Sequence, residues 1–413
     1  MPNSFTLVFV AAIASMLVLR LWLAQRQIDH VSRHRHAVPV GFAERIPLSA
    51  HQRAADYTLA RTRFGRVSML VEVLLLLTFT LAGGLQWLHD FWSARLEGRL
   101  TYGVALILSV LAISSLVDLP QAIYRQFVIE KRFGFNRMTL GLFLVDLLKQ
   151  LVLGLAIGVP LLLTVLWLMA RMGPWWWLYV WLIWCLFNLS ILFIYPTWIA
   201  PWFNKFVPLA DLKLKTRVEN LLTRCGFASS GLFVMDGSRR STHGNAYFTG
   251  FGRSKRIVFF DTLLNRLQPA ELEAVLAHEL GHYAHRHVIK RIVLVFFGSL
   301  IILATLGYLI DTPWFFNGLG LTTRNTALAL ILFLLVLPVF IFLLTPLFSQ
   351  LSRRDEFQAD RYASTHASAD ELIAALVKLY EDNAATLTPD PLHSLFYDSH
   401  PPASVRIAQL QAR

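Results

Sequence analysis

The sequence predicts a mainly α-helical membrane protein with several spans and a small α+β segment on the cytoplasmic side. Of its 413 residues, 55% are hydrophobic and only 15% are charged, whereas soluble domains average about 25% charged residues. The mean hydropathy is +0.52, and the 12 Trp residues suit the aromatic belts found at membrane interfaces. This composition requires an apolar solvent around much of the chain.

Seven stretches are long enough to cross a bilayer as helices, at about 20 residues each. The first has no basic region before it and no convincing small-residue cleavage site after it, so it is interpreted as a retained membrane helix. The seven stretches are 4–24, 68–88, 103–123, 142–170, 175–199, 288–310 and 327–349.

Basic residues are distributed unevenly among the loops. The loops after the first and third stretches are rich in Lys and Arg, and the loops after the second, fourth and sixth are poor in them. By the positive-inside tendency, the N-terminus is expected outside and the C-terminus in the cytoplasm. The net charge of +12 is then explained by cytoplasmic loops, so a nucleic-acid partner is not expected.

The expected organisation has four parts. Residues 1–199 hold five spans with basic cytoplasmic loops, and residues 288–349 hold the last two. The polar segment 200–287 and the tail 350–413 fall on the same cytoplasmic side, so they can meet. The two cysteines, Cys185 and Cys225, lie in different environments, which makes a disulfide framework improbable.

A few ionisable residues lie inside the predicted spans. They would be costly facing lipid, so we expect them to face the protein interior or to pair with one another. They are Glu72, Asp118, Asp146 and Lys149.

The polar segment mixes helical and strand-like patterns. Residues 210–225 have helical spacing, and three short β-branched and aromatic runs at 231–236, 245–249 and 256–260 predict strands of a small sheet. Pro269 followed by acidic residues favours a helix beginning there and continuing through His285.

That helix carries the sequence His278-Glu279-Leu280-Gly281-His282. Histidines at i and i+4 lie on one helix face, so both imidazoles can bind a single Zn²⁺. Glu279 is offset from that face and can take a proton from a water bound to the same ion. Gly281 is expected to leave space beside the metal.

A catalytic zinc needs a third protein ligand and an open position for water. The metzincin pattern is excluded, because its third histidine would stand at Val288. His285 and His287 are nearby alternatives, but three residues after His282 the chain turns partly away from the metal. An exposed polar position is the simpler interpretation of both.

A better candidate follows the last span. Glu356 and Asp360 stand at i and i+4 in a helical pattern, so Glu356 can bind zinc while Asp360 accepts the outer N–H of a zinc-bound histidine. A solvated acidic face is the alternative interpretation, with three arginines as its partners: Arg353, Arg354 and Arg361.

The chemistry also needs a donor for the oxyanion of a tetrahedral intermediate. His400 or Arg406, both in the C-terminal segment, could supply it. A surface turn would explain His400 equally well, because two prolines follow it, and a solvated side chain would explain Arg406.

Taken together, these residues resemble the type I CAAX prenyl endopeptidase family, integral-membrane zinc proteases that also process a fungal mating pheromone. The resemblance covers most of the chain beyond the first loop. It rests on several separated motifs in the same order: Phe127–Asn136, Ile199–Phe206, His243–Phe251, the histidine helix, Glu356–Asp360 and His400–Pro402.

The family resemblance implies seven transmembrane helices that enclose a water-filled chamber, with a zincin-like catalytic unit at the cytoplasmic end. It implies one Zn²⁺ held by His278, His282 and Glu356, with Glu279 as the catalytic base. It further implies oxyanion help from His400, a contact of Asn245 with the substrate backbone, and a contact of Arg406 with the active site or the substrate.

The expected partners are peptide or protein substrates, with or without a lipid modification, and membrane lipids. The chain ends without a dilysine retrieval signal, and its Arg, Ala, Leu and Trp content suits a bacterial homologue in the inner membrane. Because bacteria generally lack prenylation, broader processing of membrane-associated peptides is an alternative. Two further alternatives are a quality-control zinc protease of the membrane and, from another class, a transporter with a structural zinc.

Overall fold

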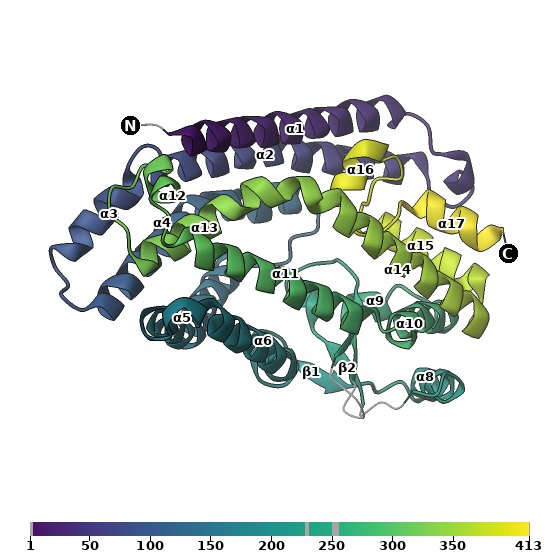
Figure 1. The fold of residues 1–413 in the computed structure, drawn as a ribbon. Coiled ribbons are helices and arrows are strands. Elements are labelled where there is room, and N and C mark those ends of the chain that lie inside the picture. Colours follow the sequence, from purple (N-terminus) through teal and green to yellow (C-terminus); the bar gives the residue numbers. More distant parts are fainter. Residues whose placement is uncertain (1–2, 228–230, 250–255, 413) are drawn as a thin grey trace.

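Long apolar helices make up most of the molecule, and a small sheet with several shorter helices lies at one end of them (Figure 1). This computed structural model describes residues 3–227, 231–249 and 256–412. The last two residues of the expected motif His243–Phe251 lie outside these ranges.

Among the described residues, six helices are long and apolar enough to cross a membrane. A seventh crossing is formed if the bent pair α2 and α3 counts as one span, since their axes differ by 49°. The helices are α1 (Ser4–His34), α2 (Leu48–Phe79) with α3 (Gly84–Ser93), α4 (Arg99–Tyr124) with the π-helical turn Arg125–Glu130, α5 (Leu140–Arg171), α6 (Trp176–Ile194), α11 (His287–Leu309) and α13 (Thr326–Ile341).

The predicted spans overlap these helices, but the bounds differ: 175–199 and 327–349 run past the ends of α6 and α13, and other helices extend beyond the predicted spans. For example, α1 continues to His34 and α2 begins at Leu48, so the arginines of the first basic loop lie largely on helices. Apolar length predicts where a helix crosses the bilayer, not where its hydrogen bonding ends. Between α2 and α3, Gly83 adopts φ 79°, a conformation that favours glycine and allows the bend.

A four-stranded mixed sheet follows α6 and the short α7 (Ala200–Phe203). Its order is β1-β2-β4-β3, with β2 and β4 parallel and the other pairs antiparallel. The three predicted strands are confirmed, and β3 is an edge strand. The strands are β1 (Phe206–Pro208), β2 (Leu232–Met235), β3 (Ala246–Thr249) and β4 (Arg256–Phe260). Strand β1 was not predicted, because this strand is short and contains a proline.

One of the remaining helices connects the last two spans, and the others surround the sheet or follow the last span. The predicted helix at 210–225 is confirmed as α8 (Leu212–Arg224). The others are α9 (Asp261–Leu264), α10 (Pro269–Ala284), α12 (Pro313–Gly318), α14 (Thr345–His366), α15 (Ala369–Asp382), α16 (Pro391–Tyr397) and α17 (Ala403–Gln411).

The start of α10 is fixed by its own sequence. Pro269 occupies its first turn, and the Glu271 carboxylate accepts the backbone N–H of Gln268 in a capping box. Its end differs from the expectation that the helix would continue through His285. Instead α10 ends at Ala284, Arg286 adopts a left-handed conformation with φ 55°, and α11 begins at His287.

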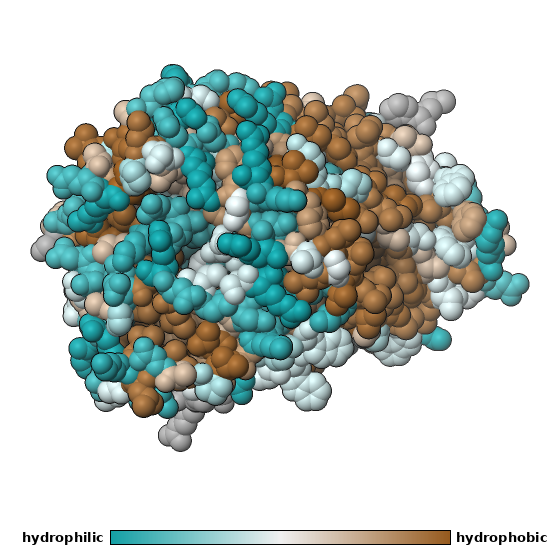
Figure 2. Space-filling view, turned by 180° about the vertical axis from the view of Figure 1, so that it is seen from behind, coloured by the Kyte–Doolittle hydropathy of each residue, from teal (hydrophilic) through white to brown (hydrophobic). Residues whose placement is uncertain are grey.

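Two hydrophobic cores divide the molecule. One joins the spans, with Phe9, Leu106 and Leu332 almost fully buried. The other joins the sheet, α10, α15 and α17, with Val218, Phe259 and Leu280 at its centre. Figure 2 shows the same division on one face: hydrophobic residues cover the part built from spans, and hydrophilic residues gather over the end that carries the sheet.

Three of the four ionisable side chains expected inside the spans have partners on other elements, whereas Asp118 is exposed and accepts from Gln121 of its own helix at 3.3 Å. Arg240, from the loop after β2, makes a bidentate ion pair with buried Asp146 at 2.9 and 3.0 Å. Glu72 pairs with Arg20 at 2.9 Å, and Nζ of Lys149 donates to the Trp202 carbonyl at 2.7 Å. The Asp146 pair joins α5 to the sheet end of the molecule.

The two ends of the chain are also joined. Asp390 caps α16 and forms a bidentate ion pair with Arg26 of α1, while its backbone N–H donates to the Gln27 side chain at 2.7 Å. Asp390 is almost fully buried. The first span is therefore fastened to the C-terminal segment.

The close approach of α10 to α14 depends on Gly281. A Cβ at this position would lie 2.8 Å from Cα of Ala359 and 3.0 Å from Cβ of Tyr362. The sequence predicts that Gly281 leaves space beside the metal, but the structure gives this glycine another role. Because it has no side chain, the backbones of α10 and α14 can approach each other.

Substituting Gly281 with alanine should push α14 away from α10. Overpacking of this kind costs about 1–3 kcal/mol, so we expect a lower midpoint of thermal unfolding in detergent. Gly298→Ala in α11 is the matched control, because a Cβ at that position would meet no atom within 4 Å. Equal midpoints for the two variants would contradict the packing argument.

Candidate metal centre

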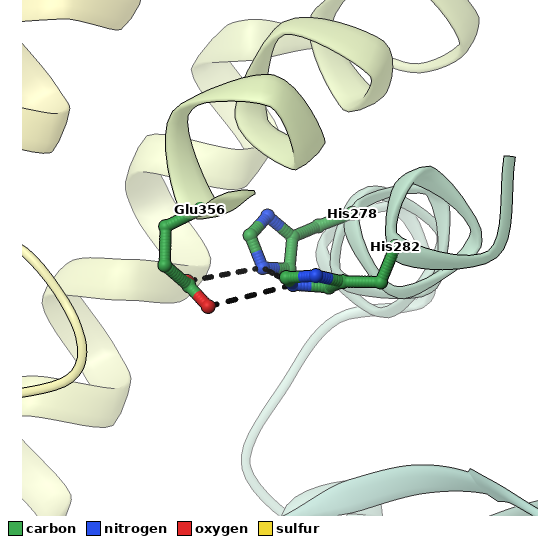
Figure 3. Close-up of side chains that lie close together, drawn as sticks. All are labelled: His278, His282 and Glu356. Carbon is green, nitrogen blue, oxygen red and sulfur yellow. Dashed lines mark hydrogen bonds and ion pairs between the residues drawn. The ribbon is translucent and has the colours of Figure 1, made fainter. Parts of the chain in front are cut away.

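Two imidazoles from one helix and one carboxylate from another converge at the sheet end of the molecule (Figure 3). His278 and His282 stand one turn apart on α10, and Glu356 faces them from α14. The two Nε2 atoms are 3.3 Å apart, and each has one Glu356 oxygen at 3.5 Å. Among the described residues, this is the one group of three or more such side chains that could hold a metal ion.

The separations fit a metal ion. Zinc binds His nitrogen and carboxylate oxygen at about 2.0–2.2 Å in a tetrahedron, which separates neighbouring ligand atoms by about 3.3–3.6 Å. The buried Oε2 of Glu356 has no hydrogen-bond partner among the described residues. A buried carboxylate oxygen without a donor is costly, and a cation bound by all three side chains would compensate it.

Asp360 stands behind His278. Its Oδ1 lies 2.8 Å from Nδ1 of His278, so the ring can donate its outer N–H to Asp360 and keep Nε2 free for a metal. This is the geometry that the spacing of Glu356 and Asp360 predicts, one helical turn apart on α14.

Arg406 reaches this cluster from α17. Its Nε and Nη2 donate to the two oxygens of Asp360 at 2.8 and 2.5 Å, and its Nη1 lies 3.7 Å from Oε2 of Glu356. The residue is only 6% exposed. Its guanidinium is therefore engaged with the carboxylates behind the donors, rather than presented to a cavity.

The two alternative histidines differ in position. His285 is exposed after the end of α10. His287 is buried, and its Nδ1 lies 3.0 Å from Nδ1 of His282, on the side of that ring opposite the donor atom. Neither belongs to the converging group.

Glu279 lies beside the three donors on α10. Burial raises the pKa of its carboxyl, and the nearby charges of His278 and Arg406 oppose that shift, whereas Glu356 adds to it. A bound cation would favour the ionised carboxylate further. The arrangement can thus hold a base next to a metal-bound water.

His400 approaches Glu356 from the C-terminal segment. Its Nε2 lies 3.4 Å from Oε1 of Glu356, and its side chain is 63% exposed. It lines a cavity of about 950 Å³ between α1, α2, the start of β3 and the C-terminal segment. The three donors do not line this cavity, and His400 is the lining residue that contacts one of them, Glu356.

Asn245 lines the same cavity. It immediately precedes β3; its carbonyl accepts the N–H of Phe260 and its side-chain oxygen accepts the N–H of Ala246 at 2.8 Å. The cavity wall also includes groups that the sequence did not single out, among them Tyr57, Tyr380 and Asn383.

Sequence reasoning missed His287 and Gln358 as neighbours of the donors. Nε2 of His287 lies 3.0 Å from the Gln358 side-chain oxygen. The only sequence signal was the number of histidines after His282. Their spacing on a continuous helix directs them elsewhere, and the break at Arg286 could not be seen in the sequence.

Two family models together match almost the whole chain. The model described as the CAAX prenyl protease N-terminal, five membrane helices, matches residues 27–205. The model of peptidase family M48 matches residues 208–413, which include all three converging side chains.

Curated relatives give the same assignment. A CAAX prenyl protease 1 homolog from Arabidopsis thaliana is 34% identical, covering 86% of each chain. CAAX prenyl protease 1 from Saccharomyces cerevisiae is 36% identical over 72% of this chain and 70% of its own. The homolog from Homo sapiens is 31% identical over 98% of this chain and 95% of its own.

The fold matches a solved structure as well. The crystal structure of S. mikatae Ste24p superposes with a TM-score of 0.92 at 30% sequence identity, over 99% of this chain and 100% of that one. The mainly helical, multi-span membrane fold predicted from the sequence is confirmed by this match. The chain belongs to the CAAX prenyl protease 1 family of integral-membrane M48 metallopeptidases.

Proposed function

We propose that this chain is a zinc endopeptidase that cleaves membrane-associated peptides near their C-termini, with CAAX-type prenylated peptides as its substrate class. The names of the relatives support the substrate class. The observation that carries the proposal is the convergence of His278, His282 and Glu356, with Glu356 in contact with His400 on the wall of a cavity of about 950 Å³.

In this proposal His278, His282 and Glu356 hold the ion. Zinc in this position would polarise the scissile carbonyl and lower the pKa of a water molecule toward about 7. The nature of the donors supports zinc, because two imidazoles and one carboxylate leave a fourth position open, as in catalytic zinc sites. Asp360 and Arg406 hold His278 and Glu356 in place from behind.

Glu279 acts as the proton carrier. Its carboxylate accepts a proton from the attacking water and donates it to the nitrogen of the leaving amine. The short distance along α10 to His278 supports this role, since the base directly follows a metal ligand in the sequence. A carboxamide at this position would keep the shape and lose the base.

His400 is proposed to donate a hydrogen bond to the oxyanion. Its exposure to the cavity and its 3.4 Å separation from Glu356 support this role. Arg406 is the weaker candidate, because its guanidinium is engaged by Asp360. The substrate-binding role expected for Arg406 is accordingly not part of the proposal.

The substrate is proposed to bind as an extended strand along β3. This strand is at the edge of the sheet, so its outer backbone groups can pair with a peptide. Asn245, at the start of β3 and on the cavity wall, is proposed to contact the peptide backbone.

The orientation proposed from the loop charges puts this site on the cytoplasmic side. The composition suits a bacterial inner membrane, where lipids would surround the spans. The transporter alternative is not favoured, since a structural zinc site usually has four protein ligands, and the converging group among the described residues has three.

Replacing Glu279 with glutamine should abolish hydrolysis and preserve metal binding. General acid–base catalysis contributes about 10²–10⁴-fold to rate, so we expect the turnover of a fluorogenic peptide to fall by at least the lower figure. The zinc content of the purified protein, measured by mass spectrometry, should remain near one per chain. Full proteolysis by this variant would contradict the assignment of the base.

A farnesylated peptide ending in a CAAX sequence should be cleaved faster than its unprenylated counterpart. We expect a difference of about tenfold or more in kcat/KM, equivalent to about 1.4 kcal/mol of transition-state binding. Chelation should stop both reactions, and added Zn²⁺ should restore them. Equal rates for the two peptides would favour a broad-specificity peptidase, with Glu279→Gln as the inactive control.

A further inference from the structure

A series of hydrogen bonds continues from His282 away from the metal donors, through buried His287 to Gln358 at the surface. Nδ1 of His282 lies 3.0 Å from Nδ1 of His287, and Nε2 of His287 lies 3.0 Å from Oε1 of Gln358. Oδ1 of Asp355 is 3.4 Å from the same nitrogen. The His287 side chain is only 2% exposed, whereas Gln358 is exposed, so the ring is shielded from water and its acceptor reaches the surface.

The break between α10 and α11 creates this contact. On an uninterrupted helix, a residue five positions after His282 would point away from it. Arg286 adopts φ 55°, which turns the chain, and His287 becomes the first residue of α11. A left-handed conformation is costly for a residue other than glycine, and here it brings the His287 ring against the His282 ring.

One assignment of protons satisfies each hydrogen bond from His282 through His287 to Gln358. If Nε2 of His282 gives its lone pair to a metal, Nδ1 of that ring must carry the proton and donate it. The acceptor at 3.0 Å is then Nδ1 of His287, so the other nitrogen of His287 carries a proton and donates to Gln358. Both acceptors that face Nε2 of His287 are oxygens, which agrees with this assignment.

We propose that His287 is a positioning residue that fixes the tautomer and the ring orientation of His282 for metal binding. This inference rests on the proposed function, namely that the site holds zinc. Metal-binding histidines usually donate their second N–H to a carboxylate, a carbonyl or a water. Here a second imidazole and an amide take that place for His282, while Asp360 takes it for His278.

The acceptor residues that orient the two metal-binding histidines lie on the same helix. Asp360 and Gln358 lie on α14, as does Glu356. The two histidines of α10 are thereby oriented from α14, one directly and one through the first residue of α11. The orientation of His282 consequently depends on the junction of α10 with a membrane span.

The test measures the affinity of the purified full-length protein for Zn²⁺, by competition with a chelator of known affinity. His287→Phe fills the space without an acceptor, and we expect about 10–100-fold weaker binding, the usual cost of losing such a partner. His287→Asn retains an oxygen near the position of Nδ1, so it should recover most of the affinity. His285→Phe is the matched control, an exposed histidine two residues away, and should bind like the unmodified protein.

Two further measurements separate positioning from general destabilisation. Gln358→Leu leaves His287 in place and removes the nearer of its two acceptors, so it should weaken zinc binding less than His287→Phe does. In the cobalt-substituted protein, the visible absorption bands should shift for His287→Phe and not for His285→Phe, because they report the geometry of the ligands.

The outcomes distinguish this inference from the proposed function. If the unmodified protein binds no zinc, the proposed function fails and the inference fails with it. If the unmodified protein binds zinc and His287→Phe binds it equally well, only the inference is overturned. Equal losses for His287→Phe and His287→Asn would indicate packing rather than hydrogen bonding, and would also overturn it.

Discussion

The backbone contact between α10 and α14 is the constraint on which the metal centre depends. His278 and His282 lie on one helix and Glu356 on the other, more than seventy residues apart in the sequence. Gly281 stands between the two histidines and lets α10 approach Ala359 of α14. A side chain there would separate the helices and with them the donor atoms, whose separations of 3.3 and 3.5 Å leave little tolerance.

The charges around this contact explain why a cation suits it. Glu279, Glu356 and Asp360 are acidic, and Arg406 is the cation that pairs with Asp360. With all of them ionised, two negative charges remain without compensation in a largely buried region. Burying unpaired charge is costly, and a divalent ion would balance these two charges. The same ion would also satisfy the Glu356 oxygen that lacks a donor.

Much of this architecture follows from local sequence patterns, because these patterns reflect interactions between residues that are close together in the sequence. Apolar length predicted the spans, short β-branched and aromatic runs predicted β2, β3 and β4, and the acidic pair at i and i+4 predicted how Glu356 and Asp360 would face α10. The remaining features depend on contacts between residues that are far apart in the sequence, which a local pattern does not reveal. The short strand β1, the true reason for Gly281 and the location of His287 all result from packing or from the turn at Arg286.

The ion pair between Arg26 and Asp390 can form only late in the synthesis of the protein. A ribosome releases the chain from its N-terminus, so the first helix enters the membrane long before Asp390 exists. Glu356 and Arg406 also emerge late, after all the spans. A nascent chain that already carries both histidines therefore lacks the groups that complete the centre. Translation itself thus delays the appearance of a working peptidase until the last helices have left the ribosome.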